Sequence, residues 1–342
     1  MILFLSWYTS SVCIAEIGNE DFTVAEILKI TESEISREIE AEILSTKQVI
    51  QIEQSDGFVF TEKQQPRIGE NVVLGKFEMP NGIEWQIYDK YRFPALIVII
   101  ALLFMVAIGI GGWRGASSLI GLAASISIII WGIIPAIVAG HSPLAVCLIG
   151  GVVIAGVTIF LAHGFSKNSA LAFVVMLISL FFAAGLATVF AEYAQLFGAG
   201  SEEAFYLTNE VFGNINLRGL LLGGILIGAL GVLDDVTVAQ VTVIAELKKA
   251  NPRLAFRELF YRGLKVGREH IASMINTLAL AYVGVSLPLV LLFMIDGSQP
   301  WWVVLNSEFI AEEIIRTVVG SIALIFAVPI ASGIGAYFLG KK

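Results

Sequence analysis

Two adjacent carboxylates, Asp234 and Asp235, lie inside a long apolar run that extends from Gly219 to Glu246. On a helix that rises 1.5 Å per residue, Asp234 is roughly 22 Å from Gly219, less than the ~30 Å needed to cross a bilayer core. A carboxylate at that depth costs several kcal/mol unless it is paired or hydrated, so it indicates a functional site. The acids therefore predict a place where a cation or a proton is bound.

Other polar side chains continue this site along the same helix. At 100° per residue, Asp235 and Glu246 share a narrow sector, and Thr237 and Gln240 extend the polar surface around the helix. Such a surface is too polar for lipid, so neighbouring helices or a wet cavity are expected to enclose it. We expect Asp234, Asp235, Thr237 and Gln240 to bind the ion or substrate, with Glu246 in a proton relay.

The apolar segment 271–295 carries a second polar stripe, with residues recurring at steps of three and four. Its members are His270, Ser273, Asn276, Thr277 and Gly284. We expect Asn276 and Thr277 to complete the ion site, because both can donate to a carboxylate. His270 titrates near neutral pH and is a second candidate for the proton relay.

Both groups have structural alternatives. Asn276 and Thr277 are equally consistent with hydrogen bonds that hold two helices together. Arg268 or Lys265 could neutralise the aspartates and lock the helices without any ion traffic.

A third polar group begins the last apolar segment and comprises Glu308, Glu312, Glu313 and Arg316. Glu312 and Arg316 are four residues apart in the favourable order, which predicts an ion pair on one helix face. We expect this group to form an outer gate or a pairing site. The alternative is that two of the three glutamates are simply solvated.

The composition is that of a polytopic membrane protein. Of 342 residues, 57% are hydrophobic and 15% charged, and the mean hydropathy is +0.83. The net charge of −8 is concentrated in residues 16–90, which carry 16 acidic and 7 basic side chains. Nucleic acid is not expected as a partner. Cys13 and Cys147 support neither a disulfide framework nor a metal cluster, and we expect no metal and no cofactor.

The N-terminal quarter differs from the rest. Residues 1–19 are apolar up to a small-x-small pattern at Cys13-Ile14-Ala15, which predicts an export signal or an N-terminal apolar segment. Residues 20–92 alternate apolar and polar side chains with period two, as in half-buried antiparallel strands. Pro80-Asn81-Gly82 predicts a hairpin turn between strands at 72–78 and 83–88. We expect a small extracytoplasmic all-β domain of about five strands, in the form of a barrel or a sandwich.

Residues 93–342 contain seven apolar segments that are long enough, or nearly so, to cross a bilayer. They are 94–110, 117–139, 143–162, 169–190, 219–245, 271–295 and 311–338. Basic residues fall on every second connection, at Arg114, at Lys167 and in the basic loop 246–270, which marks these connections as cytoplasmic. The fold class expected is an α-helical polytopic membrane protein of about seven transmembrane helices, with the β domain outside and the C-terminus inside, in a bacterial cytoplasmic membrane.

Two connections have further patterns. The basic loop 246–270 is amphipathic and is expected to lie along the inner membrane surface, attracted by anionic lipid; a docking site for a nucleotide or a protein is the alternative. Residues 201–212 predict a short external helix with acidic residues in its first turn.

The motifs resemble one known family. The order of an exported β domain and seven spans, with GALGVLDDVTVAQ at 228–240, ELKKANP at 246–252, GREHIASMINTLALAYVG at 267–284 and LNSEFIAEEIIRTVVGSI at 305–322, is similar to the YibE/F-like family. The likeness covers residues 22–338. It implies a bacterial multi-pass membrane protein of a kind described as permeases, with no substrate or mechanism to carry over.

Three functions remain at this point. The first is a permease-type transporter or channel for a small cation or a proton-coupled solute. The second is a non-catalytic assembly or regulatory protein that links the β domain to a cytoplasmic partner, and either could form a homo-oligomer. The third is an intramembrane hydrolase, which fits poorly because neighbouring residues on a helix point about 100° apart and do not easily flank one bond. We therefore expect no enzymatic activity.

Overall fold

The computed structural model consists of two compact units, which are described separately. The first contains the strands and continues to Val106, and the second runs from Ala107 to the C-terminal end. The residues described are 22–32, 36–55, 65–79, 82–207, 215–297 and 300–340. The expected signal segment 1–19 lies outside them, as does the turn at 80–81.

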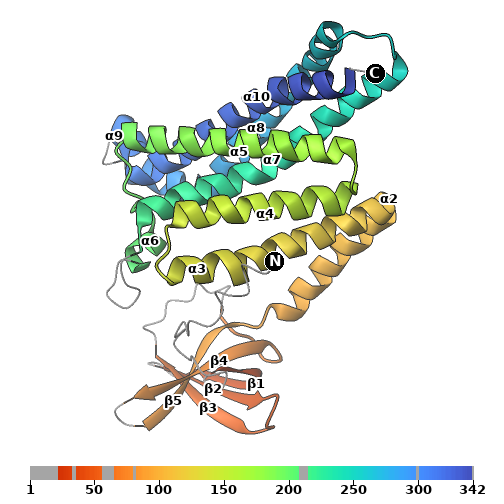
Figure 1. The fold of residues 1–342 in the computed structure, drawn as a ribbon. Helices are drawn as coiled ribbons and strands as arrows, with labels where there is room; N and C mark the ends of the chain where they lie inside the picture. Colours follow the sequence, from red (N-terminus) through yellow and green to blue (C-terminus); the bar gives the residue numbers. More distant parts are fainter. Residues whose placement is uncertain are drawn as a thin grey trace. The chain divides into compact units, whose positions relative to one another are not determined.

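The N-terminal unit is a five-stranded antiparallel sheet in the order β3-β2-β1-β4-β5 (Figure 1). Its strands are β1 (Phe22–Glu32), β2 (Ser36–Ile43), β3 (Val49–Ser55), β4 (Asn71–Met79) and β5 (Gly82–Lys90). The period-two segments therefore form strands as expected, and β4 and β5 form the expected hairpin. The edge strands β3 and β5 also approach each other, so the sheet is curled.

The alternation of side chains places one face of this sheet in a small core. Ile27 pairs with Ala41 across β1 and β2, and Ile39 pairs with Ile52 across β2 and β3. All four side chains are at most 2% exposed. An ion pair at the start of β4 and the end of β5 joins Lys90 Nζ to Glu70 Oε2 at 2.9 Å, and both side chains are half-buried. This hydrogen bond holds the pKa of the Glu70 carboxyl below its usual value.

The remainder is helical. Its elements are α2 (Phe93–Ile128), η1 (a π-helical turn, Ile129–Ile133), α3 (Ile134–Val138), α4 (Pro143–His163), α5 (Lys167–Tyr193), α6 (Glu202–Leu207), α7 (Leu217–Ala250), α8 (Phe256–Asp296), α9 (Trp301–Asn306) and α10 (Glu308–Gly340). Short helix α6 occupies part of the expected external helix, and residues 208–214 lie outside the described part. Within the described residues, six helices are long and apolar enough to cross a membrane.

The first two expected spans are joined in one 46-residue apolar stretch, Phe93–Val138. The stretch is interrupted at Gly112, which has φ 57° and ψ −140°, a conformation that only glycine adopts without strain. Beyond this break, Gly115 packs so closely on the helix before Gly112 that a Cβ there would lie 2.0 Å from the Ala107 carbonyl oxygen. The two glycines therefore break the helix where the sequence predicts a connection.

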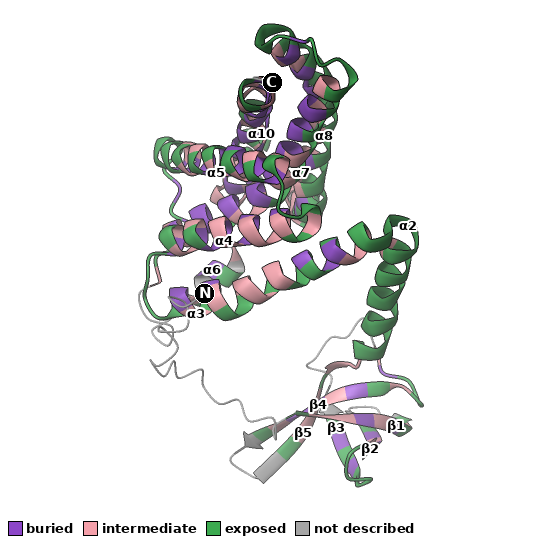
Figure 2. Ribbon diagram, turned by 45° about the vertical axis from the view of Figure 1, so that its right-hand side comes forward, coloured by how far each residue is buried: buried purple, intermediate pink, exposed green. Residues whose placement is uncertain are grey.

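Helix α7 is the centre of the bundle and contacts α4, α5, α8 and α10 (Figure 1). Within its most apolar window 56% of the residues are buried, against 0–39% in the other five long helices, and Figure 2 shows this difference along the ribbon. Helices α4 and α10 run parallel to α7, whereas α8 runs antiparallel to it. The contacts that establish these directions are Pro143–Gly219, Cys147–Gly223, Gln240–Ser332, Ile244–Gly335, Gln240–Gly263 and Gly228–Tyr282.

Candidate functional site

Asp234 lies halfway along α7 and is half-buried. Its backbone carbonyl accepts a hydrogen bond from the Thr237 hydroxyl at 3.2 Å. Thr158 on α4 is a polar neighbour of its carboxylate. The Oδ1 atom is buried and has no hydrogen-bond partner among the described residues. A buried carboxylate oxygen without a partner is costly, and such an atom is suited to binding a proton or a cation.

Asp235, the next residue, is exposed, and its electrostatic partners are two histidines on other helices. His270 is on α8, where the sequence placed a relay candidate, and His163 is the last residue of α4. His163 also interacts with Arg114, which follows the break in α2. Four elements therefore bring ionisable side chains to one place around Asp235.

Sequence reasoning missed His163 and Thr158. Helix α4 ends at His163 because Gly164 follows with φ 71°, and Ser166 caps the next helix by accepting from the Ser169 N–H at 3.1 Å. These local signals are readable in the sequence. The level at which α4 ends depends on its parallel packing against α7, which no local pattern reveals.

Gln240 is 3% exposed and holds three helices together. Its Nε2 donates to the Gly263 carbonyl of α8 at 2.9 Å and to Ser332 Oγ of α10 at 2.8 Å. Thr237 is fully buried one turn away. Both residues lie on the enclosed side of α7, and the hydrogen-bond donors of Gln240 are already used by the protein.

Asn276 and Thr277 do not join this cluster. Helix α8 packs on the core through Ile271, Met274 and Ile275, whereas Asn276 and Thr277 are exposed on another side of the helix. The Thr277 hydroxyl donates to a carbonyl of its own helix, at Ser273, at 3.1 Å.

Glu246 and His270, the two relay candidates, are both exposed. Glu246 pairs with Lys249 of the same helix at 2.6 Å. His270 interacts with Asp235, as described above. Neither Arg268 nor Lys265 forms an ion pair with Asp234 or Asp235 in the described part of the chain. The alternative that one of these basic residues neutralises the aspartates directly therefore finds no ion pair to support it.

The outer group is more ordered than solvated glutamates would be. Glu308 Oε1 accepts hydrogen bonds from three successive backbone N–H groups, those of Phe197, Gly198 and Ala199, at 2.6, 2.8 and 3.3 Å. Glu312 is 8% exposed and accepts from the Gly200 N–H at 3.2 Å. These bonds attach the segment after α5 to the first turns of α10.

The expected Glu312–Arg316 ion pair is wrong. Arg316 Nη1 instead pairs with Oε1 of Glu313, three residues earlier on α10, at 2.7 Å. Glu312 points to the Gly200 backbone, which leaves Glu313 as the neighbour within reach. The Arg316 guanidinium also lies 5.9 Å from the centre of the Tyr282 ring of α8, within the range of a cation–π contact.

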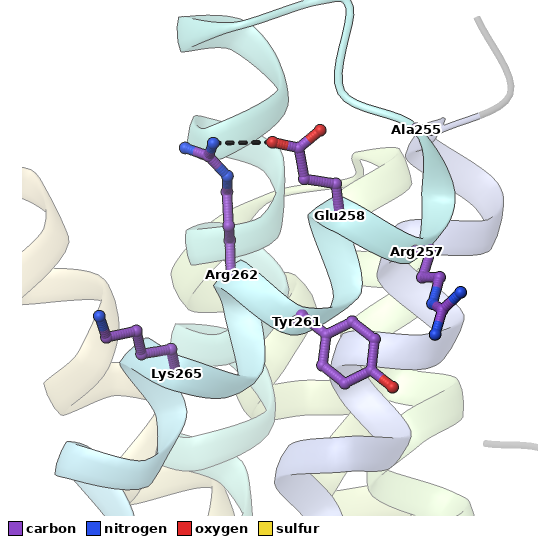
Figure 3. Close-up of a pocket in the computed structure, with 6 residues that line it drawn as sticks. All are labelled: Ala255, Arg257, Glu258, Tyr261, Arg262 and Lys265. Carbon is purple, nitrogen blue, oxygen red and sulfur yellow. Dashed lines mark hydrogen bonds and ion pairs between the residues drawn. The ribbon is translucent and has the colours of Figure 1, made fainter.

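The basic segment does not form a separate surface helix. From Phe256 it belongs to α8, which continues without a break to Asp296. Figure 3 shows its first turns, where Arg262 reaches Glu258 at 2.7 Å and Arg257 lies over the Tyr261 ring. Lys248 of α7 donates to the carbonyls of Leu254 and Gly340 at 3.0 and 3.3 Å, so the C-terminal ends of α7 and α10 are joined to the residues just before α8. Because these ends pack together, the basic residues from Phe256 onward continue along the axis of α8.

No group of three or more His, Cys, Asp or Glu side chains in the described part of the chain is arranged to hold a metal ion. The arrangement around Asp234 and Asp235 is instead a carboxylate pair with two imidazoles and a guanidinium nearby. Such a set can bind and pass protons, because imidazole and carboxyl groups both exchange them readily.

Comparison with known proteins identifies the family and gives no closer relative. No curated protein and no solved structure matches the chain. The family model described as YibE/F-like protein matches residues 98–341, which covers all the long helices from α4 to α10 and most of α2. With well over half of its length matched, the chain belongs to the YibE/F-like family.

Proposed function

We propose that the protein crosses a bacterial cytoplasmic membrane seven times, with the β domain outside and the C-terminus inside. The stretch Phe93–Val138 has 46 residues, which at 1.5 Å each gives about 69 Å, twice the ~30 Å of a bilayer core. The break at Gly112 supports two spans there, with Arg114 at the inner turn. The parallel and antiparallel directions of α4, α7, α8 and α10 are those that the alternating loop charges require.

Within that topology we propose a permease-type transporter or channel for a small cation or a proton-coupled solute. The observation that carries this function is the buried Oδ1 of Asp234 beside Asp235, which has no hydrogen-bond partner among the described residues, with histidines of two other helices interacting with the second acid. An acid held in a spanning helix without a neutralising pair marks an ion or proton pathway. No enzymatic step is included.

The residues divide into two roles. Asp234, with Thr158 beside it, binds the cation or proton within the bundle. Asp235, His163 and His270 exchange it with the cytoplasmic side, because they lie where α4 ends and are exposed. Gln240 and Thr237 hold the surrounding helices in position.

Reconstitution into proteoliposomes tests this function. The wild type is expected to carry a pH-gradient- or cation-driven flux, and the double variant Asp234→Asn, Asp235→Asn is expected to abolish it while remaining folded. The matched control is Glu246→Gln, an exposed acid on the same helix, which is expected to retain flux. If the wild type moves no ion in a broad screen, the transport function is wrong.

A second function, an assembly or regulatory protein, is favoured by one observation. The first turns of α8 expose Arg257, Tyr261 and Lys265 around a shallow hollow at the inner end (Figure 3). Exposed arginine and tyrosine are enriched in protein interfaces. Capture of a specific cytoplasmic protein that is lost in Arg257→Ala, with no flux in the wild type, would establish this function instead.

A further inference from the structure

Helix α8 presents a regularly spaced face to α10. Leu278, Tyr282 and Ser286 occur at steps of four, so they lie on one face of α8. A Cβ on Gly320 would lie 3.0 Å from Leu278 Cδ2, and Arg316 lies over the Tyr282 ring. Because the helices are antiparallel, one further turn places Ser286 at the level of Glu312 and Glu313.

The burial of Ser286 agrees with this register. Ser286 is 5% exposed, whereas its neighbours Val285 and Leu287 are 80% and 57% exposed. Only the side of α8 that faces another helix can bury one residue between two exposed ones. Helix α8 contacts α10 and α7, and an added Cβ on Gly224 of α7 would meet nothing within 4 Å, so we infer that, among the described helices, α10 covers Ser286.

Three polar atoms at this level have unmet hydrogen-bonding capacity. Ser286 Oγ, Glu313 Oε2 and Arg316 Nε are buried and have no hydrogen-bond partner among the described residues. Leaving such atoms unpaired is costly. Ser286 Oγ and Glu313 Oε2, on two facing helices, are oxygens that can bind a cation, whereas Arg316 Nε is a donor that an oxygen of a bound water would satisfy. Together they indicate a site that takes a polar ligand rather than a packing defect.

The charge of the site favours a cation. Glu312 and Glu313 carry two negative charges against the single positive charge of Arg316, which leaves one excess negative charge. The ionisable groups that act on Glu312 are Glu308, Glu313 and Arg316 of its own helix, and Tyr282 faces Arg316 from α8. Since Glu308 is a further acid, it adds to the negative field. The free ligands are hydroxyl and carboxylate oxygens, which suit hard cations.

We propose that Ser286, Glu312 and Glu313 form an outer site that binds one small monovalent cation, a hydronium ion or Na⁺, with Arg316 holding Glu313 in place. The site extends the proposed transport function. Its role as a binding site that the cation occupies before it reaches Asp234 rests on that function. Tyr282 connects the two regions, because its hydroxyl lies so close to α7 that a Cβ on Gly228 would be 2.6 Å from it.

The test measures binding and does not use flux. The purified full-length protein is unfolded thermally with NaCl exchanged for choline chloride at constant ionic strength, and separately over pH 5–8 in choline alone. Binding to the folded state raises the midpoint. A rise with Na⁺ at fixed pH assigns Na⁺, and a rise only with falling pH assigns hydronium. In Ser286→Ala and Glu313→Gln the apparent affinity for the cation, taken from the midpoint shift, is expected to fall about tenfold, as for one lost hydrogen bond to a charged group.

Two controls separate the outcomes. Ser273→Ala, which removes an exposed hydroxyl of α8, is expected to keep the full response, and so is Glu258→Gln, which neutralises an exposed acid of the same helix. Without the cation, Ser286→Ala is expected to be at least as stable as the wild type, because it removes an unpaired buried hydroxyl. The site is wrong if neither Na⁺ nor pH shifts the midpoint, or if Ser286→Ala and Glu313→Gln respond like the wild type. A cation response in a protein without flux would keep the site and reject transport.

Discussion

Thr158 of α4 is a polar neighbour of the Asp234 carboxylate of α7, five residues before α4 ends at His163. This relationship sets the level of the acidic pair in the bundle. Asp234 is flanked by α4, whereas Asp235 lies where α4 ends and is exposed. The two adjacent acids therefore have different surroundings, one enclosed and one open, which suits the relay proposed above.

The Gln240 hydrogen bonds are expected to contribute strongly to stability. Gln240→Ala removes two buried hydrogen bonds and leaves the Gly263 carbonyl and the Ser332 hydroxyl to find other partners, at a cost of about 2–4 kcal/mol. Thermal unfolding in detergent measures the loss. Thr242→Ala, which changes an exposed residue on the same helix, serves as the control. Equal stability of the two variants would show that Gln240 does not hold the helices together.

The break in α2 is expected to depend on two glycines. Gly115→Ala places a Cβ against the Ala107 carbonyl, and Gly112→Ala forces a side chain into a backbone conformation that disfavours it. Each change is expected to cost about 1–3 kcal/mol or to straighten the helix. Gly111→Ala, where an added Cβ meets nothing within 4 Å, is the control. Accessibility of a cysteine introduced at Arg114 reports the inner turn; unchanged labelling and stability would contradict the break.

Attachment of the segment after α5 to α10 is expected to fail when Glu308 loses its charge. Glu308→Ala removes three hydrogen bonds to a carboxylate, worth about 1.5–3 kcal/mol each at most, and frees the Phe197–Ala199 backbone. Hydrogen–deuterium exchange of that segment should accelerate, and the rest of the bundle should exchange as before. Glu203→Ala, at an exposed acid of α6, is expected to leave the segment protected. Unchanged exchange in Glu308→Ala would be inconsistent with the contact.

The β domain is expected to lose stability in acid through Glu70. The pKa of Glu70 is below its ordinary value of 4.5 because of the hydrogen bond from Lys90. The folded state therefore binds fewer protons than the unfolded state, and the stabilisation is complete at pH values above 4.5. It is lost as the pH falls through the lowered pKa. Hydrogen exchange of β4 and β5 in the full-length protein should show this loss, and Lys90→Gln should reduce the pH dependence, leaving the smaller part that comes from Arg67. Lys47→Gln, at an exposed pair, should not change it.

Strands and long helices could be predicted because their signals are local. Ile27 and Ile39 alternate with polar residues along strands that have one buried face. The apolar runs of the long helices are as long as a bilayer crossing requires, which identifies them as membrane-spanning candidates. The acidic pair was recognisable for the same reason, since its position in an apolar run is a property of one segment.

Pairings between segments could not be predicted. Whether Arg316 meets Glu312 or Glu313 depends on the Gly200 backbone, which arrives from more than a hundred residues earlier and takes Glu312. Asn276 and Thr277 are exposed because the apolar residues of α8 face the core of the bundle instead. The basic segment follows the axis of α8 because the ends of α7 and α10 pack against it. Each of these outcomes is decided by tertiary contacts.

The most direct measurement is the initial rate of cation- or pH-gradient-driven uptake into proteoliposomes by the wild type, Asp234→Asn and Asp234→Glu, at equal amounts of folded protein. If Asp234 carries the charge across the bundle, Asp234→Asn is expected to be inactive and Asp234→Glu to recover part of the rate. If Asp234→Asn takes up the cation or protons at the wild-type rate, this carboxylate does not carry the charge.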